Sequence, residues 1–221
     1  MTFSKMGMAK FISHLDLLRC FERAILRSGL PVEYSQGFNP HQKMTFALPL
    51  PVGVTSECEV VDIFFEEGKI SDLEITEKLN LNLPPDIRVI ETGDVCHKAA
   101  DIVRAEYSVV LRSDKDISEE WIKSFFAKDE VVVMKKTKKK TDKPINIMEY
   151  IRSWDIVGKS MTSMTLKLVL DAGGERNIKP DVVINELCKE NPSILADEAD
   201  IHRCKIFCRT DDNFDTIEVF K

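Results

Sequence analysis

The feature that most constrains the fold is the order of strand-like and helix-like patterns in the first 91 residues. Residues 15–28 place apolar side chains at helical spacing, between a Ser13 N-cap and a terminating Gly29. Residues 57–65 alternate and are rich in Val, Ile and Phe, which is typical of a strand. Further strands are expected at 2–11, 46–50 and 87–91, and a second helix at 71–83. This order, β-α-β-β-α-β, is that of a ferredoxin-like unit.

The second half repeats the same order of elements. Strands are expected at 105–112, 130–134, 154–157, 164–170 and 201–208, and helices at 118–127 and 180–189. The two halves share no residue-level identity. The sequence therefore predicts an α+β fold of two tandem ferredoxin-like halves with antiparallel sheets, 1–95 and 104–221, the second with a lysine-rich hairpin loop.

Composition and charge limit the classes of function. The chain has 221 residues, 43% of them hydrophobic, as in ordinary globular proteins. The formal net charge of −6 means that binding to nucleic acid would depend on a local basic patch. No run approaches the roughly 18 apolar residues of a membrane helix, and no secretion signal is evident. We therefore expect a cytoplasmic protein that does not associate with membranes.

The six cysteines are scattered and favour reduced thiols over a disulfide framework. The C-x-x-x-C-x-x-C run that holds an iron–sulfur cluster is absent, so we expect no cluster, no metal and no other cofactor on this chain. His202, Cys204 and Cys208 share one side of a predicted strand, which superficially resembles half of a metal site. Ile206 lies on the same side, and a buried apolar face is the favoured interpretation.

Several short motifs in residues 1–65 together resemble a known family. They include Ser13-His14-Leu15-Asp16, Gly37-Phe38-Asn39-Pro40-His41 and Pro49-Leu50-Pro51-Val52-Gly53. The chain resembles the radical-SAM-linked proteins, a bacterial domain family of unknown function. Gln42 departs from the proline that the family usually has after the histidine.

The resemblance implies partners rather than a mechanism. Family members occur attached to a radical SAM protein or encoded near one, often beside a ribonuclease of the E/G type. A separate radical SAM protein is therefore the expected partner, and S-adenosylmethionine and the iron–sulfur cluster are expected on that partner. RNA metabolism is the implied setting. The layout also looks like those of tRNA pseudouridine synthases and CRISPR repeat-processing endoribonucleases, although fold alone does not assign function.

The first predicted helix carries a row of charged side chains. At 100° per residue, one row along the helix holds Asp16, Cys20, Arg23 and Arg27, with Arg19 just beside it. Guanidinium groups bind phosphate or carboxylate bidentately, so this face is a candidate for an RNA backbone or an acidic partner. The alternative is a solvated face on which Asp16 and Glu22 neutralise the arginines.

The turn-rich segment after this helix offers the groups that a nucleotide site uses. Its candidate binding residues are Tyr34, Gln36, Phe38, Asn39, His41 and Lys43. The alternative is a purely structural turn in which Phe38 packs inward. His14 and His41 are also candidates for general acid and base catalysis of RNA cleavage, provided that the fold brings them together.

A run of lysines interrupts the second half. Lys135, Lys136, Lys138, Lys139 and Lys140 are candidates for contacts with phosphates. A hairpin tip that requires solubility would have the same composition.

Three functions fit these observations. The favoured one is an accessory binding module, without activity of its own, that works with a radical SAM protein in tRNA or rRNA metabolism or modification. The second is a metal-independent RNA-processing or RNA-modifying enzyme that uses His14 and His41. The third is a scaffold for protein–protein interaction.

Overall fold

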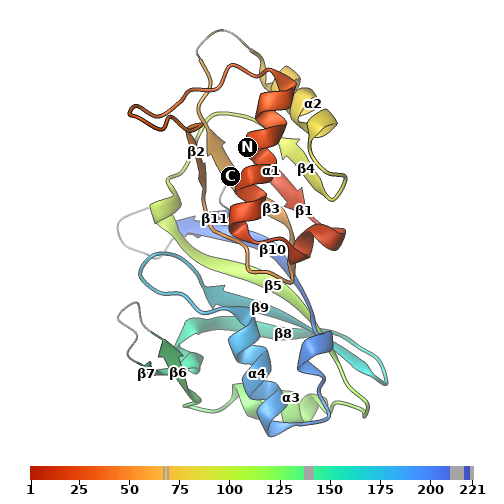
Figure 1. Ribbon diagram of the computed structural model, residues 1–221. Helices are drawn as coiled ribbons and strands as arrows, with labels where there is room; N and C mark the ends of the chain where they lie inside the picture. The colour runs from red at the N-terminus through yellow and green to blue at the C-terminus, as the bar shows by residue number, and fades with distance from the viewer. Residues whose placement is uncertain (67, 69, 137–141, 210–216, 220–221) are drawn as a thin grey trace. The chain divides into compact units, whose positions relative to one another are not determined.

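The computed structural model describes residues 1–66, 68, 70–136, 142–209 and 217–219 (Figure 1). It is a mixed α+β protein whose described residues form four α-helices and mostly antiparallel sheet. The chain divides into two compact units, one of Met1–Ile102 with Arg203–Lys221 and one of Val103–His202.

The first unit contains the β-α-β-β-α-β order that the sequence predicts. Its elements are β1 (Thr2–Lys5), the 3₁₀ turn η1 (Gly7–Phe11), α1 (His14–Ser28), β2 (Met44–Phe46), β3 (Val54–Ile63), α2 (Asp72–Asn82), β4 (Ile87–Glu91) and η2 (Ala99–Asp101), followed late in the chain by β10 (Asp200–Arg209) and β11 (Ile217–Val219). The strand order is β4-β1-β3-β10, with β2 paired to β3 and β11 paired to β10.

The ends of α1 follow from local chemistry, as predicted. The hydroxyl oxygen of Ser13 accepts a hydrogen bond from the amide of Asp16 and caps the first turn. Gly29 ends the helix with a φ of 64°, a left-handed conformation that favours glycine. The buried face of α1 consists of Leu17, Phe21, Ala24 and Ile25.

One hydrophobic core joins both helices to the same face of the first sheet. Phe3 of β1 contacts Phe21 of α1 edge-to-face, with ring centroids 5.1 Å apart. Val61 of β3, Leu79 of α2 and Ile87 of β4 complete the centre of this cluster, and all three are fully buried. Burial of these apolar side chains fixes the orientation of α1, whose opposite face remains exposed to solvent.

The second unit has a similar order of elements, with one addition. It contains β5 (Ile102–Arg112), α3 (Glu119–Phe126), β6 (Val132–Lys136), β7 (Asp142–Asn146), η3 (Ile147–Tyr150), β8 (Ile151–Lys159), β9 (Ser163–Asp171), α4 (Pro180–Glu190) and η4 (Ala196–Glu198). Strand β9 lies between β5 and β8, antiparallel to both. Strands β6 and β7 form a separate two-stranded hairpin.

Some predicted boundaries differ from those of the structure. The strand predicted at 46–50 is Met44–Phe46, because Pro49 and Pro51 lack the amide hydrogens that strand pairing needs. The strand predicted at 2–11 ends at Lys5, and a 3₁₀ turn follows it. The expected division at 104–221 also differs, because Arg203–Lys221 belongs to the first unit. None of the described helices has the length and apolar character needed to cross a membrane.

Candidate nucleic-acid interface

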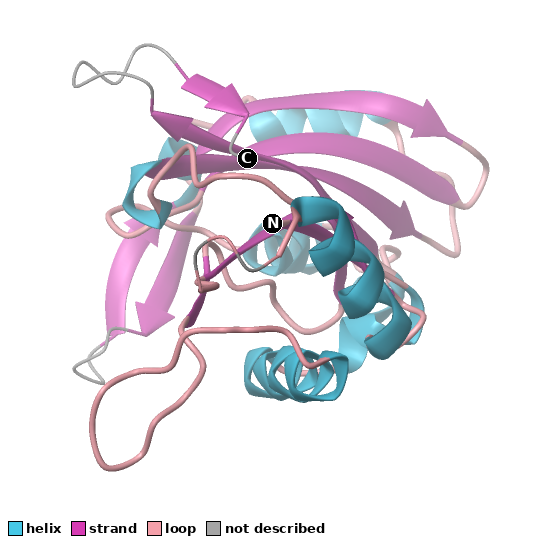
Figure 2. Ribbon diagram, turned by 90° about the horizontal axis from the view of Figure 1, so that it is seen from above, coloured by secondary structure: helices cyan, strands magenta, loops and turns pink. Residues whose placement is uncertain are grey.

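Hydrogen bonds close the loop between α1 and β2 at its base. Tyr34 and Gln42 form an isolated antiparallel bridge, and the amide of Ser35 donates to the carbonyl oxygen of His41 at 2.8 Å. The amide of His41 donates to Ser35 Oγ at 3.0 Å, and this hydroxyl lies 2.8 Å from His41 Nδ1. The segment 36–40 is therefore a tip held from both sides. It extends away from the rest of the first unit, in orange in Figure 1 and in pink in Figure 2.

The tip presents its aromatic side chain to solvent. Phe38 is fully exposed, which excludes the structural alternative in which it packs inward. Gln36 and Asn39 are exposed beside it, and Tyr34 at the base is 43% exposed. Gly37 has a φ of 127°, which only glycine adopts readily. The whole ring of Phe38 is therefore available to stack against a base.

The side chain of Gln42 attaches the base of the loop to α1. Nε2 of Gln42 donates to the backbone carbonyl oxygen of Glu22 at 3.3 Å, and Gln42 is buried. Lys43 is engaged within the loop, since its ammonium group lies 2.6 Å from a carboxylate oxygen of Glu33.

The exposed face of α1 is only partly neutralised. Arg19 forms an ion pair with Asp16 at 3.0 Å, and Arg27 donates to the backbone carbonyl oxygen of Asn82. The hydrogen bond from the Ser13 hydroxyl, together with that from Arg19, lowers the pKa of Asp16. Arg23 is exposed and has no ion pair or hydrogen bond among the described residues. The alternative of complete pairing by Asp16 and Glu22 therefore does not hold for Arg23.

The two histidines have separate surroundings. The ring of His14 contacts Phe46 edge-to-face at 5.3 Å, and its Nδ1 is buried without a hydrogen-bond partner in the described part of the chain. His41 is exposed and interacts with Ser35. Gln42, next to His41, contacts α1 at Glu22, eight residues or about 12 Å along the helix from His14. Within the described residues, no hydrogen bond or ring contact joins the two imidazoles.

The lysine-rich segment is described in part. Lys135 and Lys136 belong to β6, whereas Lys138, Lys139 and Lys140 lie outside the described residues. The ammonium group of Lys135 donates to the carbonyl oxygen of Asn177 at 2.7 Å and lies 5.8 Å from the centroid of the Tyr150 ring. Lys143 of β7 is exposed.

The buried apolar face predicted near the end of the chain is confirmed in part, because His202 and Cys204 on the same side of the strand are only half-buried. Ile206 and Cys208 are fully buried and pack in one cluster with Val60. Across the residues that the structure describes, no three His, Cys, Asp or Glu side chains form a group that could hold a metal ion.

Sequence reasoning missed a buried ionic cluster in the first unit. Nη1 of Arg203 lies 3.0 and 3.1 Å from the two carboxylate oxygens of Glu59, and both side chains are at most 5% exposed. Lys5 is buried nearby, and its ammonium group donates to the carbonyl oxygen of Ile12. Burial lowers the pKa of Lys5, and Glu59 partly offsets this effect. The available sequence signal was Glu59 inside an apolar, β-branched strand.

Comparisons with solved structures show a similar fold. A chain in the crystal structure of a Cbf5-Nop10-Gar1 complex matches with a TM-score of 0.51 and 9% identity, over 92% of this chain and 47% of that chain. A chain in the crystal structure of the archaeal box H/ACA sRNP Nop10-Cbf5 complex gives 0.47 and 10%, over 90% and 45%. A chain in the structure of an H/ACA RNP bound to a substrate RNA containing 2'-deoxyuridine gives 0.48 and 9%, over 87% and 43%. The protein thus spans slightly less than half the length of each of these three chains.

The comparisons of sequence place the chain in a family. The chain matches no curated protein. Residues 1–180, which include the closed loop and the arginine face of α1, match the family described as "Uncharacterized protein conserved in bacteria (DUF2344)". The chain belongs to this DUF2344 family.

Proposed function

We propose that this protein is an RNA-binding accessory module whose binding surface is formed by the 36–40 tip and the exposed face of α1. One observation carries the proposal: hydrogen bonds hold a fully exposed Phe38 on a closed loop whose base is attached to the helix that carries Arg23. An exposed aromatic ring that can stack on a base and a guanidinium group that can bind phosphate are the groups that single-stranded RNA sites use.

Different residues of the proposed surface would contact the bases and the phosphates of the RNA. An unstacked base would lie on the ring of Phe38, and the amide of Asn39 would bond to its edge. Arg23 would bind phosphate directly, and Arg19 would do so by exchanging Asp16 for the phosphate. Lys143, on the second unit, is exposed and would attract phosphate by charge alone, without reading the sequence.

The setting that we propose combines two lines of support. The resemblance to radical-SAM-linked proteins supports a separate radical SAM protein as partner, which would hold the S-adenosylmethionine and the iron–sulfur cluster, with a ribonuclease of the E/G type in association. The fold similarity to a chain of the Cbf5-Nop10-Gar1 complex is compatible with a role in RNA metabolism. The module would present RNA to the radical SAM enzyme and would not act on it alone.

We also propose that each unit has a ferredoxin-like arrangement. In the first unit this is supported by the strand order β4-β1-β3 with β2 on β3, and by the packing of α1 and α2 on one face. In the second unit it is supported by β9 between β5 and β8, with the β6–β7 hairpin as an insertion.

The test is binding of fluorescently labelled total cellular RNA to the purified protein at about 50 and about 200 mM salt. Phe38→Ala and Arg23→Ala are compared with matched controls on the same unit, Leu81→Ala for an exposed apolar side chain and Arg88→Ala for an exposed arginine. We expect Arg23→Ala to weaken binding and to reduce the slope of log affinity against log salt by about 0.7. Phe38→Ala should cost about 1–3 kcal/mol of affinity, with the salt slope unchanged.

Equal losses in the two test variants and the two controls would contradict the proposal, because they would indicate nonspecific attraction. Absence of RNA binding at the lower salt concentration would also reject it. Co-purification of the tagged protein from a native lysate tests the partner separately, and recovery without any radical SAM protein would remove that element of the proposal.

A further inference from the structure

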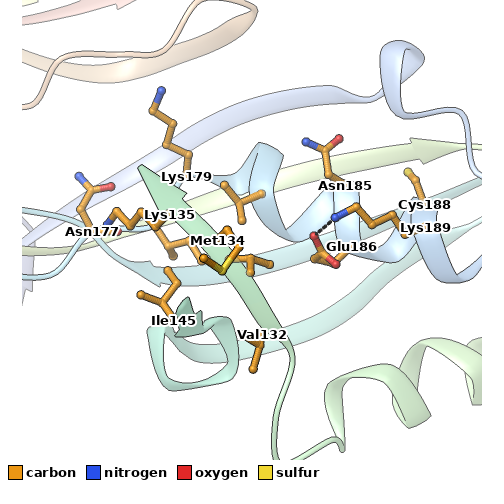
Figure 3. Close-up of a pocket in the computed structure, with 13 residues that line it drawn as sticks. Val132, Met134, Lys135, Ile145, Asn177, Lys179, Asn185, Glu186, Cys188 and Lys189 are labelled. Carbon is orange, nitrogen blue, oxygen red and sulfur yellow. Dashed lines mark hydrogen bonds and ion pairs between the residues drawn. The ribbon is translucent and has the colours of Figure 1, made fainter. Parts of the chain in front are cut away.

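The second unit contains a groove between the β6–β7 hairpin and α4, with a volume of about 1080 Å³ (Figure 3). Met134 and Ile145 line it from the hairpin, and Val182 and Cys188 line it from α4. Small-molecule sites measure about 300–1,000 Å³, so this groove is slightly larger than the usual range for such a ligand. It is also an open groove that a length of polypeptide can enter.

Strand β6 lines the groove along its edge. Four consecutive residues of the strand, 132–135, contact it, although successive side chains of a strand point to opposite faces. Consecutive residues can line one groove only where the strand presents its backbone edge as well as its side chains. In the described part of the chain, β6 pairs with β7 alone, so its other edge carries unpaired amide and carbonyl groups.

Apolar side chains stand exposed along this edge. Val132 is 50% exposed and Met134 is 60% exposed, on the same face of β6. Edge strands that must avoid other strands usually carry charges at such positions. An edge with unpaired hydrogen-bonding groups and exposed apolar side chains is suited to the addition of another strand.

The charges around the groove are mainly positive. Lys135 and Lys189 are engaged, the first by the carbonyl oxygen of Asn177 and the second by the carboxylate of Glu186 at 2.6 Å. Lys179 is exposed, and its ammonium group has no hydrogen bond or ion pair among the described residues. Three lysines against one glutamate give the lining a net charge of +2 and favour an acidic ligand.

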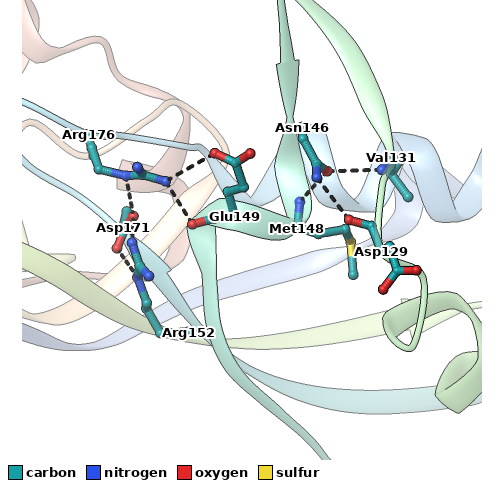
Figure 4. Close-up of polar contacts among 8 residues, drawn as sticks. All are labelled: Asp129, Val131, Asn146, Met148, Glu149, Arg152, Asp171 and Arg176. Carbon is teal, nitrogen blue, oxygen red and sulfur yellow. Dashed lines mark hydrogen bonds and ion pairs between the residues drawn. The ribbon is translucent and has the colours of Figure 1, made fainter.

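The hairpin that forms one wall is anchored before any ligand binds (Figure 4). Oδ1 of Asn146 accepts hydrogen bonds from the amides of Val131 and Met148 at 3.0 and 3.1 Å, and its Nδ2 donates to the carbonyl oxygen of Asp129 at 2.9 Å. The side chain of Asn146 fixes the point where β7 ends, and the hydrogen bond from Lys135 connects β6 to Asn177. A pre-formed wall lowers the entropy cost of binding.

We propose that this groove binds an extended, acidic peptide segment of a partner protein, which adds to the free edge of β6 as a third strand. Main-chain hydrogen bonds to β6 would supply affinity. Alternate apolar side chains of the peptide would pack on Met134 and Val182, and its acidic residues would pair with Lys179. None of the described residues that line the groove is aromatic, whereas an RNA track usually combines aromatic rings with positive charge.

The experiment uses the full chain and two fluorescein-labelled nonapeptides. Both alternate valine and threonine in the centre, and one is flanked at each end by two glutamates while the other is flanked by two lysines. The protein variants are Met134→Asp and Lys179→Glu, and the matched control is Met161→Asp, which changes an 85% exposed methionine outside the groove. Hydrogen exchange of the 132–135 amides reports strand pairing, and a peptide N-methylated on alternate amides tests the main-chain bonds without altering the protein.

We expect the glutamate-flanked peptide to bind and to slow exchange of the β6 amides. Met134→Asp and Lys179→Glu should weaken binding by roughly tenfold or more, and Met161→Asp should not. N-methylation of the edge that faces β6 should abolish binding, whereas N-methylation of the opposite edge should preserve it. Equal binding of both peptides, insensitivity to N-methylation, unchanged exchange of β6, or protection of β6 by RNA in place of peptide would each overturn the proposal. Phe38→Ala and Arg23→Ala should leave peptide binding intact, which separates this test from that of the proposed RNA surface.

Discussion

Arg203 of β10 and Glu59 of β3 form a buried ion pair across 144 positions of sequence. The guanidinium group also donates to the carbonyl oxygen of Leu48 at 3.0 Å. The pair connects two strands of one sheet through side chains that water does not reach. Removal of one partner would leave the other charge buried, which is more costly than loss of an exposed pair.

Glu59→Gln should therefore lower the free energy of unfolding by about 3–5 kcal/mol. Chemical denaturation in urea measures the change. The exposed pair of Arg112 with Asp200 provides the control, and Arg112→Ala should cost no more than about 1 kcal/mol. Similar losses in the two variants would show that the Glu59 pair is not effectively buried.

Lys5 gives a prediction about pH. Its pKa in the folded protein is lowered from the ordinary value of 10.5, chiefly because burial disfavours the charged form. Between the lowered folded pKa and 10.5, the unfolded chain binds more protons, so stability rises with pH through this window. Below the window, the folded protein carries the full penalty of a buried charge.

Lys5→Met should remove this alkaline gain in stability. The unfolding free energies of the two proteins, measured in steps between neutral pH and 10, should differ by an amount that shifts in favour of the wild type as pH rises. Other groups that titrate in this range are common to both proteins and cancel in the difference. A difference that is independent of pH would contradict the lowered pKa.

Cys58 should be chemically inert in the folded protein. Burial raises the pKa of its thiol to about 12, and Sγ contacts the carbonyl oxygen of Arg203 at 3.6 Å. Since the thiolate is the reactive form, iodoacetamide at neutral to mildly alkaline pH should label the exposed Cys96 long before Cys58. Mass spectrometry of peptides from a labelling time course gives the two rates. Comparable rates in the native protein, and not only in denaturant, would refute the prediction.

Substitution of His14 and substitution of His41 should affect different properties of the protein, stability in the first case and RNA binding in the second. His14→Ala removes a ring contact with Phe46 and should cost about 0.5–1.5 kcal/mol of stability. His41→Ala removes the contact of the imidazole with Ser35 at the base of an exposed loop, so it should weaken RNA binding while the melting temperature stays within about 2 °C. Calorimetry and RNA titration distinguish the two effects. Loss of an RNA-cleaving activity in both variants, with folding intact, would favour the enzymatic alternative.

Asn146→Ala should loosen the hairpin without unfolding the second unit. The substitution leaves the amides of Val131 and Met148 without their acceptor, at a cost of about 1–3 kcal/mol. Hydrogen exchange should accelerate in 132–135 and 143–146 and stay unchanged in β9. Uniform acceleration across the unit would mean that the hairpin is part of one cooperative structure.

Much of the fold was predictable because its signals are local. The caps of α1 depend on Ser13 and Gly29, which are adjacent to the helix, and β3 is recognisable from its Val- and Ile-rich composition. The pairing of β10 with β3 was not predictable, because periodicity identifies a strand but does not identify its neighbour. The position of β2 was misjudged because two prolines exclude pairing in part of an otherwise strand-like segment.

The sequence predicted which residues could form the candidate surface, but not which of them would be engaged by other side chains. Their chemical types made Phe38, Arg23 and Lys43 candidates together. The structure leaves the first two accessible and pairs Lys43 with Glu33, a contact over ten positions that no spacing rule indicates. The groove beside β6 was missed because an exposed Met134 in a short strand has the same sequence pattern as a buried one.

The division of the chain also has a consequence during synthesis. The second unit is a continuous stretch, Val103–His202, whereas the first needs Arg203 from the following segment to complete its pairing with Glu59. Domains usually fold in N-to-C order as they leave the ribosome. In this chain the order is partly reversed. The second unit can form all its contacts before Arg203 has left the ribosome, and only then can Arg203 pair with Glu59 of the first unit.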